Sequence, residues 1–496
     1  MNDVNRKMAA GIAWMSMMRV GVKGLSLIST IALARLLAPG DFGLIAMAMS
    51  VISALDLIRA FNFDLALIHR QNTDRTYYDT AWTFNISFSF ALAVILLCIA
   101  PVATIFFKEP RLLAVMRWLA LSVFISGFEN IGVVAFRKEL VFHKEFVLRI
   151  VQKACGIAVT VPLAFALRNY WALVIGAVSD SLLAVVISYL AHPFRPRLSL
   201  KASKHLFSFS KWLVATNSIW FLRDRVPDYV LGRVAGTSAL GLFSLSVEIS
   251  NLPTSELIAP MNRAVFPAYA KMAHDLKELQ QGFLNVIGLI LLVALPAGFG
   301  ISATSELIVD VVLGTKWEAA VPAISILAIY GSINAMQTNC GAIHYAMSRP
   351  RTVAVMGAIH AALVLPLVIV GAYRYGAIGV AWVYLIAAII VVPLNYYVVL
   401  RRLHLAMRTV GNLLWRPAVA TAIMYTVTHE WIAARPSRTL PALLAAILIG
   451  VVTYGAALAA LWLVSGRPIG PERTLTNRLL VPAWSRLSAR WARGAA

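Results

Sequence analysis

Long apolar stretches separated by short polar segments run through this chain from its first residues to near its end. Many of these stretches reach the roughly 18 residues that an α-helix needs to cross the hydrocarbon core of a bilayer. The pattern therefore predicts about fourteen transmembrane helices. The predicted spans are residues 11–34, 42–66, 80–106, 114–135, 149–168, 170–191, 208–232, 239–261, 282–302, 319–340, 352–373, 376–399, 412–432 and 440–464.

Composition narrows the class further. Hydrophobic residues make up 60% of the 496 residues and charged residues 13%, whereas a soluble domain carries about 25% charged residues. The mean hydropathy is +0.77. We therefore predict an all-α integral membrane protein. Cys98, Cys155 and Cys340 lie in apolar stretches without a CxxC pair, and we interpret them as small packing residues.

The net charge of +22 has an explanation in membrane topology. With an even number of spans, Lys and Arg are roughly three times as frequent on the side of the two termini as on the opposite side. This bias predicts that both termini are cytoplasmic. Because no basic domain stands apart from the spans, we do not expect the chain to bind nucleic acid.

An internal repeat divides the chain. Arg35 and Gly43 in ARLLAPGDFGL recur as Arg233 and Gly241 in GRVAGTSALGL, each between the first and second spans of a half. Six spans per half predict two parallel repeats around a central cavity. The predicted domains are an N-terminal six-helix lobe (1–200), a C-terminal six-helix lobe (201–405), a further helix pair (406–465), and a basic tail (466–496) that is either amphipathic or disordered.

Ionisable residues inside spans are the candidates for chemistry, because each is costly in a membrane unless it is paired or faces water. Arg19 and Lys23 are four residues apart and share one face of the first span. Two stacked cations need an anion, which is either a partner carboxylate or a bound ligand. Arg59, in span 42–66, is a candidate for the same site.

The spans that correspond under the repeat, 11–34 with 208–232 and 42–66 with 239–261, carry most of the intramembrane charge. This distribution predicts a polar cleft between the halves. Arginine suits a phosphate-bearing ligand, since it can bind phosphate through two hydrogen bonds. The basic candidates are Arg19, Lys23, Arg59, Arg223 and Arg225.

Carboxylates in the spans either neutralise these cations or, in one position, carry a proton or sodium ion for coupling. The candidates for charge pairing or coupling are Asp56, Asp64, Glu129, Asp180, Asp224, Asp228, Glu248 and Glu256. Pro227 and Pro253 lie among them and are predicted hinges, because proline bends a helix. We identify no catalytic residue, metal site or cofactor: the sequence has no Walker A motif and no HExxH.

The opening GIAWMSMMRVGVKGLSLISTIALARLLAPGDFGLIAMAMSVI resembles the start of Wzx-type polysaccharide flippases of the multidrug/oligosaccharidyl-lipid/polysaccharide exporter superfamily. The second half, with PDYVLGRVAGTSALGLFSLSVEISNLP followed by RAVFPAYAKM, resembles the same family. The resemblance covers about the first 400 residues. It implies a bacterial inner-membrane protein that moves undecaprenyl-pyrophosphate-linked oligosaccharides by alternating access, for lipopolysaccharide or exopolysaccharide biosynthesis.

The resemblance also implies a role for Arg19, Lys23 and Arg59, because related lipid II flippases hold pyrophosphate with basic residues on their first helices. The expected partners are a lipid-linked oligosaccharide, membrane lipids, H⁺ or Na⁺, and other polysaccharide assembly proteins. One alternative is a cation-coupled exporter of small compounds, which favours a cavity rich in carboxylates. Others are a membrane enzyme, which needs a large catalytic loop, and a membrane scaffold without transport.

Overall fold

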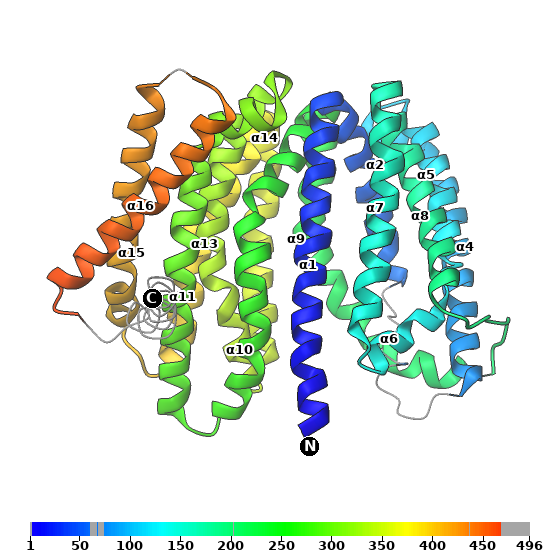
Figure 1. Cartoon of the computed structure of the whole chain (residues 1–496), viewed down its shortest axis with the longest axis horizontal. Coiled ribbons are helices and arrows are strands. Elements are labelled where there is room, and N and C mark those ends of the chain that lie inside the picture. The colour runs from blue at the N-terminus through cyan, green and yellow to red at the C-terminus, as the bar shows by residue number, and fades with distance from the viewer. Residues whose placement is uncertain (1, 60–66, 68–73, 202, 436, 468–496) are drawn as a thin grey trace, which may run out of the picture. The chain divides into compact units, whose positions relative to one another are not determined.

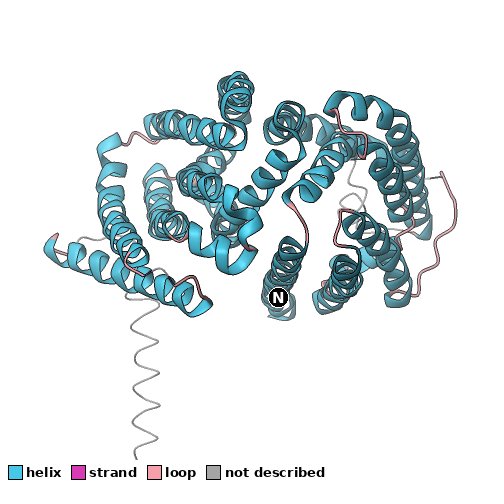
Figure 2. Ribbon diagram, turned by 90° about the horizontal axis from the view of Figure 1, so that it is seen from above, coloured by secondary structure: helices cyan, strands magenta, loops and turns pink. Residues whose placement is uncertain are grey.

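The computed structural model describes residues 2–59, 67, 74–201, 203–435 and 437–467. Throughout this part of the chain, all regular structure is helical (Figure 1, Figure 2). The predicted all-α class is therefore confirmed. A helix satisfies the N–H and C=O groups of an apolar segment within that segment, which is the requirement that a bilayer imposes.

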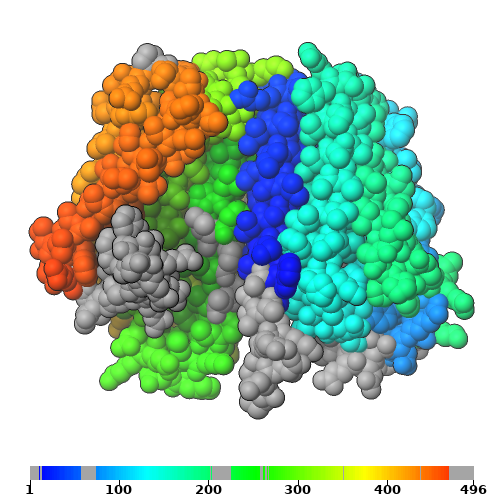
Figure 3. All heavy atoms as spheres, in the orientation of Figure 1, coloured from blue at the N-terminus to red at the C-terminus, as the bar shows by residue number. Residues whose placement is uncertain are grey.

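Two compact units divide the chain. Unit 1 comprises residues 1–244 and 368–380, and unit 2 comprises residues 245–367 and 381–496. In unit 1, α1 lies along α7 and α7 lies along α8 (Figure 1, Figure 3). The elements of unit 1 are α1 (Asn2–Leu36), α2 (Pro39–Arg59), α4 (Arg75–Phe107), α5 (Leu112–Ser126), a 3₁₀ turn (Ile131–Val133), α6 (Val134–Lys138), α7 (Phe142–Leu167), α8 (Trp171–Ala191) and most of α9 (Ser203–Ser250).

Unit 2 has its core where α11 and α13 pack, around Phe283, Ile287 and Leu291. Arg438, between the last two helices, pairs with Asp310 and lies 3.9 Å from Glu306. It thereby fastens the appended helix pair to the short helix Ser305–Ile308 and the π-turn that follows it. The elements are a π-turn (Thr254–Ile258), α10 (Ala259–Met272), α11 (Leu276–Ala303), α12 (Ser305–Ile308), a π-turn (Val309–Leu313), a 3₁₀ helix (Thr315–Ala320), α13 (Val321–Ala346), α14 (Pro350–Arg402) apart from residues 368–380, α15 (Met407–Ala433) and α16 (Leu440–Val464).

Ten of the described helices are long and apolar enough to cross a membrane, or eleven if one bent pair counts as a span. The predicted number of about fourteen stays a prediction. Two of the predicted spans, 352–373 and 376–399, form the single helix α14, which is broken at Gly376 by a φ of 56°. The predicted span 412–432 lies in α15, which does not meet the same criterion, and 208–224 lies outside the residues whose side chains are described.

The predicted span 114–135 is bent rather than continuous. Helix α5 ends at Ser126, and the segment Ile131–Lys138 continues at an angle of 61°. Buried Asn130 fixes the bend: its Oδ1 accepts from the Gly132 N–H at 2.9 Å, while its Nδ2 donates to the carbonyls of His192 and Phe194. Asn130 thus caps the start of the segment that follows α5, and its amide ties this start to the backbone after α8.

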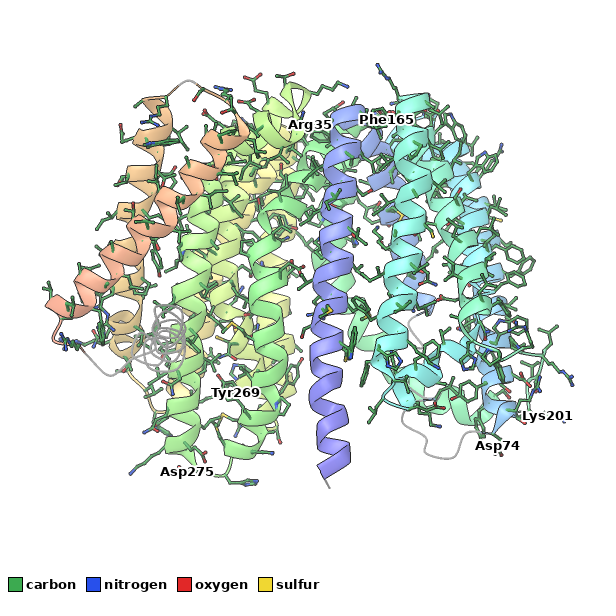
Figure 4. The ribbon with its side chains drawn as sticks, viewed as in Figure 1. Arg35, Asp74, Phe165, Lys201, Tyr269 and Asp275 are labelled. Carbon is green, nitrogen blue, oxygen red and sulfur yellow. The ribbon has the colours of Figure 1, made fainter. Side chains whose placement is uncertain are left out.

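The helices of unit 1 run between two ends (Figure 4). Arg35 and Phe165 lie at one end, and Asp74 and Lys201 lie at the other. The segment that leaves α8 at this second end packs back on the start of α4. The Arg197 N–H donates to Asp79 Oδ1 at 2.9 Å and the Ser199 N–H donates to Thr83 Oγ1 at 2.9 Å. The connection between the two predicted halves is therefore anchored to unit 1.

The two segments of the predicted repeat meet inside unit 1, where Gly43 lies in α2 and Gly241 in α9. A Cβ atom placed on Gly43 would lie 1.7 Å from the Thr237 carbonyl oxygen, and one on Gly241 would lie 1.9 Å from the Pro39 carbonyl oxygen. Each of these Cβ atoms would also lie 2.9 Å from the backbone nitrogen of the other glycine. The contact is thus reciprocal, and both positions require glycine because the opposing atoms are backbone.

We expect Gly43→Ala to destabilise the purified protein by about 2 kcal/mol, in the range for overpacking of a tight contact. Thermal unfolding in detergent, followed by tryptophan fluorescence, measures the change. Gly40→Ala is the matched control, since its Cβ would lie 3.4 Å from the movable Ser238 hydroxyl. An equal loss of stability in both variants would contradict the importance of the reciprocal contact.

Candidate functional site

The predicted pair of cations lies in the first half of the membrane span of α1. Arg19 and Lys23 are both partly buried, within the candidate span Trp14–Leu36. Helix α1 contacts α7 through another face, on which Trp14 packs at 5.2 Å from the Phe146 ring and Gly21 abuts Ile150. Arg19 and Lys23 are each two residues from Gly21, about 160° around the helix. They therefore point away from α7.

Helix α9 brings the basic candidate Arg225 into unit 1. Its Nη1 lies 3.3 Å from Asp228 Oδ2, so these two predicted site residues pair within one helix. Next to them, the Tyr229 hydroxyl donates to the Ser50 carbonyl of α2 at 2.8 Å, and its ring stacks on Phe107 of α4. Arg225 is thus held beside α2, where the exposed Asp56 also lies.

Four of the candidates cannot be placed at the level of their side chains. Asp64 lies outside the described residues. The helix backbone is described at Arg59, Arg223 and Asp224, but their side chains are not. Their predicted roles stay predictions.

The proline candidates sit in different surroundings. Pro227 is buried within α9, and Pro253 directly precedes the π-turn Thr254–Ile258. A π-turn has one more residue per hydrogen-bonded turn than an α-helix, so it interrupts the regular α-helical hydrogen bonds, as proline does. The partly buried Glu248 precedes this irregular stretch in unit 2, and the partly buried Glu256 lies within the π-turn, where its Oε1 accepts from the Ser255 hydroxyl at 2.9 Å.

A second charged group lies on α5, α7 and α8 of unit 1. Glu129, just after α5, pairs with Arg149 of α7 at 3.2 Å. Arg149 also donates to Gln152 Oε1 at 3.0 Å, and Gln152 Nε2 donates to the Ala184 carbonyl of α8 at 3.1 Å. One turn farther along α8, Asp180 lies near Lys153 of α7. Glu129 and Asp180, which were predicted separately, therefore belong to one group.

Arg149 and Lys153 were not among the sequence candidates. A signal for them was available, because they are four residues apart on one apolar helix, with the same spacing as Arg19 and Lys23. Lys153 lies within the predicted span 149–168. Arg149 is the first residue of that span, and a cation at this position is usually interpreted as one that extends to the membrane surface. The packing of α7 against α8 shows that both side chains belong to the charged group.

The two groups differ in chemistry. The pair on α1 consists of two basic residues one turn apart, and such a pair suits a polyanionic ligand such as a phosphate ester. The group on α5, α7 and α8 contains both signs and internal hydrogen bonds, and suits charge compensation or exchange of a small cation. The part of the chain that the structure describes contains no cluster of three or more His, Cys, Asp or Glu side chains that could hold a metal ion.

Comparisons with known proteins relate the chain to proteins of polysaccharide biosynthesis. A family model described as "Polysaccharide biosynthesis protein" matches residues 32–322. The chain is 24% identical over 407 residues to the lipopolysaccharide biosynthesis protein WzxC of Escherichia coli K12, covering 80% of this chain and 82% of that protein. It is 24% identical over 496 residues to the succinoglycan biosynthesis transport protein ExoT of Rhizobium meliloti, covering 97% of each. The resemblance to Wzx-type proteins is confirmed.

Solved structures agree on the fold. The lipid II flippase MurJ in an inward closed conformation superposes with a TM-score of 0.71 at 14% identity, over 90% of this chain and 98% of that one. An inward-facing multidrug resistance MATE family transporter superposes with a TM-score of 0.60 at 16% identity, over 77% and 94%. At these identities, the likeness establishes the architecture and leaves the substrate open.

We expect Arg149→Met to destabilise the protein by about 1 kcal/mol, because it leaves Glu129 without its cation in a partly buried position. The double variant Glu129→Gln/Arg149→Met should be more stable than the sum of the two single changes predicts. Thermal unfolding of the four proteins measures this coupling. Strict additivity would mean that the pair contributes nothing as a pair.

Proposed function

The chain belongs to the polysaccharide biosynthesis protein family, and on this basis we propose that it is a flippase for lipid-linked oligosaccharides. It moves undecaprenyl-pyrophosphate-linked units from the cytoplasmic to the periplasmic leaflet of the bacterial inner membrane by alternating access. The product feeds lipopolysaccharide or exopolysaccharide assembly. Both termini are cytoplasmic in this proposal, as the distribution of Lys and Arg predicts.

The observation that carries the proposal is the position of Arg19 and Lys23. Two cations lie one turn apart in a membrane span, both partly buried and both on the face that does not pack on α7. A pyrophosphate carries several negative charges, and both Arg and Lys side chains bind phosphate oxygens through charge-assisted hydrogen bonds. The same cations disfavour a cationic drug as substrate.

The named relatives point toward transport rather than catalysis. ExoT, which matches 97% of this chain, is named as a succinoglycan biosynthesis transport protein. WzxC is named for lipopolysaccharide biosynthesis, and TuaB of Bacillus subtilis for teichuronic acid biosynthesis. We therefore propose no chemical step for this chain. Moving a preassembled lipid-linked unit requires a polar path for the glycan and a partner for the phosphate charge, and no bond changes.

We expect the double charge reversal Arg19→Glu/Lys23→Glu to reduce flipping at least about tenfold, since two repulsive contacts replace two attractive ones. The host gene is deleted, variants are supplied in its place, and the leaflet holding the lipid-linked oligosaccharide is scored by labelling from the periplasmic side. The control Lys108→Glu/Arg168→Glu makes the same charge change at the ends of α4 and α7, outside the site.

Accumulation of the oligosaccharide on the cytoplasmic leaflet in the double reversal, but not in the control, is the expected result. Normal export by the double reversal, at equal protein levels, would remove the role of Arg19 and Lys23. No accumulation on deletion, together with reduced export of small cations, would replace the proposed substrate class by that of the alternative exporter.

A further inference from the structure

The interface between α7 and α8 in unit 1 has a regular antiparallel register. Gln152 bonds the Ala184 carbonyl, Gly156 faces Asp180, and Gly176 faces Thr160. Successive contacts are one helical turn apart on both α7 and α8. Both helices are candidate membrane spans, Phe142–Leu167 and Trp171–Ala191, and Gly156 and Asp180 lie near their centres.

Asp180 occupies a notch in this interface. A Cβ atom on Gly156 would lie 2.1 Å from Asp180 Oδ1, so the carboxylate lies directly against the backbone of α7. The residue is nevertheless exposed, although it lies at mid-span. Within the described part of the chain, no hydrogen bond or ion pair within 4.0 Å involves Asp180, whereas most carboxylates inside membranes have such a partner.

Two helices, α5 and α7, pack on α8 beside Asp180. From α7, the charged group near Asp180 is Lys153, at longer range than an ion pair, whereas Arg149 lies two turns from Gly156 and is paired with Glu129. From α5, the neighbour at this level is the neutral Ser122, which bonds Ser181 at 2.7 Å. Among the described residues, Asp180 therefore has one nearby cation, Lys153, and no hydrogen-bond donor.

A set of hydrogen-bonded polar groups begins one helical turn from Asp180. One turn along the interface, Gln152 bridges α7 to the Ala184 carbonyl, Gln152 accepts from Arg149, and Arg149 pairs with Glu129. From the level of Asp180 to that of Glu129 is about 12 Å along the helix axis. The path ends at the end of unit 1 that the charge distribution predicts to be cytoplasmic.

These features favour a proton over a metal ion as the ligand. A metal cation of the sodium or calcium type needs several oxygen ligands, whereas the Asp180 carboxylate stands alone beside an ammonium group. A carboxylate without donors in a membrane is stabilised most simply by taking up a proton. Because Gly156 has no side chain, the Asp180 carboxyl group has room beside α7. We expect it to gain or lose a proton without a movement of either helix.

We propose that Asp180 is a proton-binding site in unit 1, that Lys153 sets the pH at which it exchanges, and that Gln152, Arg149 and Glu129 connect it to the cytoplasmic side. Its use for coupling rests on the proposed flippase function. Its protonation does not, which allows the two to be tested apart.

Dicyclohexylcarbodiimide is the probe for protonation, because it adds to a protonated carboxyl group in an apolar environment and the adduct is located by peptide mass spectrometry. The full-length protein in lipid nanodiscs is labelled between about pH 5 and about pH 8, the range in which a coupling group must exchange. We expect labelling at Asp180 that falls at least about tenfold across this range. Mapping separates this adduct from any at Cys155, which neighbours Gly156.

Lys153→Gln tests the role of the cation. Without the ammonium group, the protonated form of Asp180 persists to higher pH, and we expect the labelling profile to move up by about one pH unit. Gly156→Ala should displace the carboxyl group and change the profile, whereas Gly24→Ala, with nothing within 4 Å of its Cβ position, should leave it unchanged. Asp180→Asn removes the labelled site.

Three results would overturn the proposal. These are the absence of labelling at Asp180 at every pH, labelling independent of pH, and an unmoved profile in Lys153→Gln. Protection by sodium chloride but not by potassium chloride at fixed pH would replace the proton by sodium and would equally overturn it.

The coupling role is tested in proteoliposomes that contain a lipid-linked oligosaccharide. Flipping by the native protein should rise at least about threefold with an imposed pH gradient, and Asp180→Asn should lose this rise. If the gradient accelerates Asp180→Asn as much as the native protein, the coupling role is wrong. If the native protein does not flip the substrate, the proposed function fails while the labelling result stands.

Discussion

The membrane-spanning helices of the described chain depend on one constraint: the core of a bilayer offers no water to hydrogen-bond the polar groups of the chain. Backbone groups meet the constraint by forming helices, and the irregular points show what is needed where a helix stops. At residues 127–130 the helix α5 ends, and the buried Asn130 amide takes over the hydrogen bonds of the turn. At the end of α8, Asp79 and Thr83 bind the backbone of the following segment.

Charged side chains meet the same constraint in three ways. Arg225 and Asp228 pair within one helix, and Arg149 and Glu129 pair between neighbouring elements. Arg438 pairs with acidic groups at the end of a different helix and fastens the last helix pair. Neither Arg19 nor Asp180 makes an ion pair with any other residue that the structure describes. In a membrane protein such exceptions mark the places where a ligand, a proton or an anionic substrate completes the charge balance.

In the flippase function proposed above, Arg19 and Asp180 have separate roles. A cationic pair on α1 suits the phosphate of the substrate, and a lone carboxyl group between α7 and α8 suits a driving ion. They lie on different faces, because Arg19 and Lys23 point away from α7 whereas Asp180 lies against it. Separate sites in one unit allow substrate and proton to act through the same helices without competing for the same atoms. The backbone contact between Gly43 and Gly241 holds the segments of the predicted repeat together at a point where no side chain can yield.

The sequence alone determined the helical membrane class, the family, and the positions of Arg19 and Lys23, because hydrophobic length and charge inside an apolar run are properties of the local chain. It also indicated Glu129 and Asp180 individually. It could not indicate that α5 bends after Ser126, since that bend depends on a contact between Asn130 and the distant His192 and Phe194. Nor could it indicate that Arg149 binds Glu129, or that Gly156 makes room for Asp180. The first relation depends on how α7 packs against the segment after α5, and the second on the register between α7 and α8. Tertiary packing sets both, and no local sequence pattern records them.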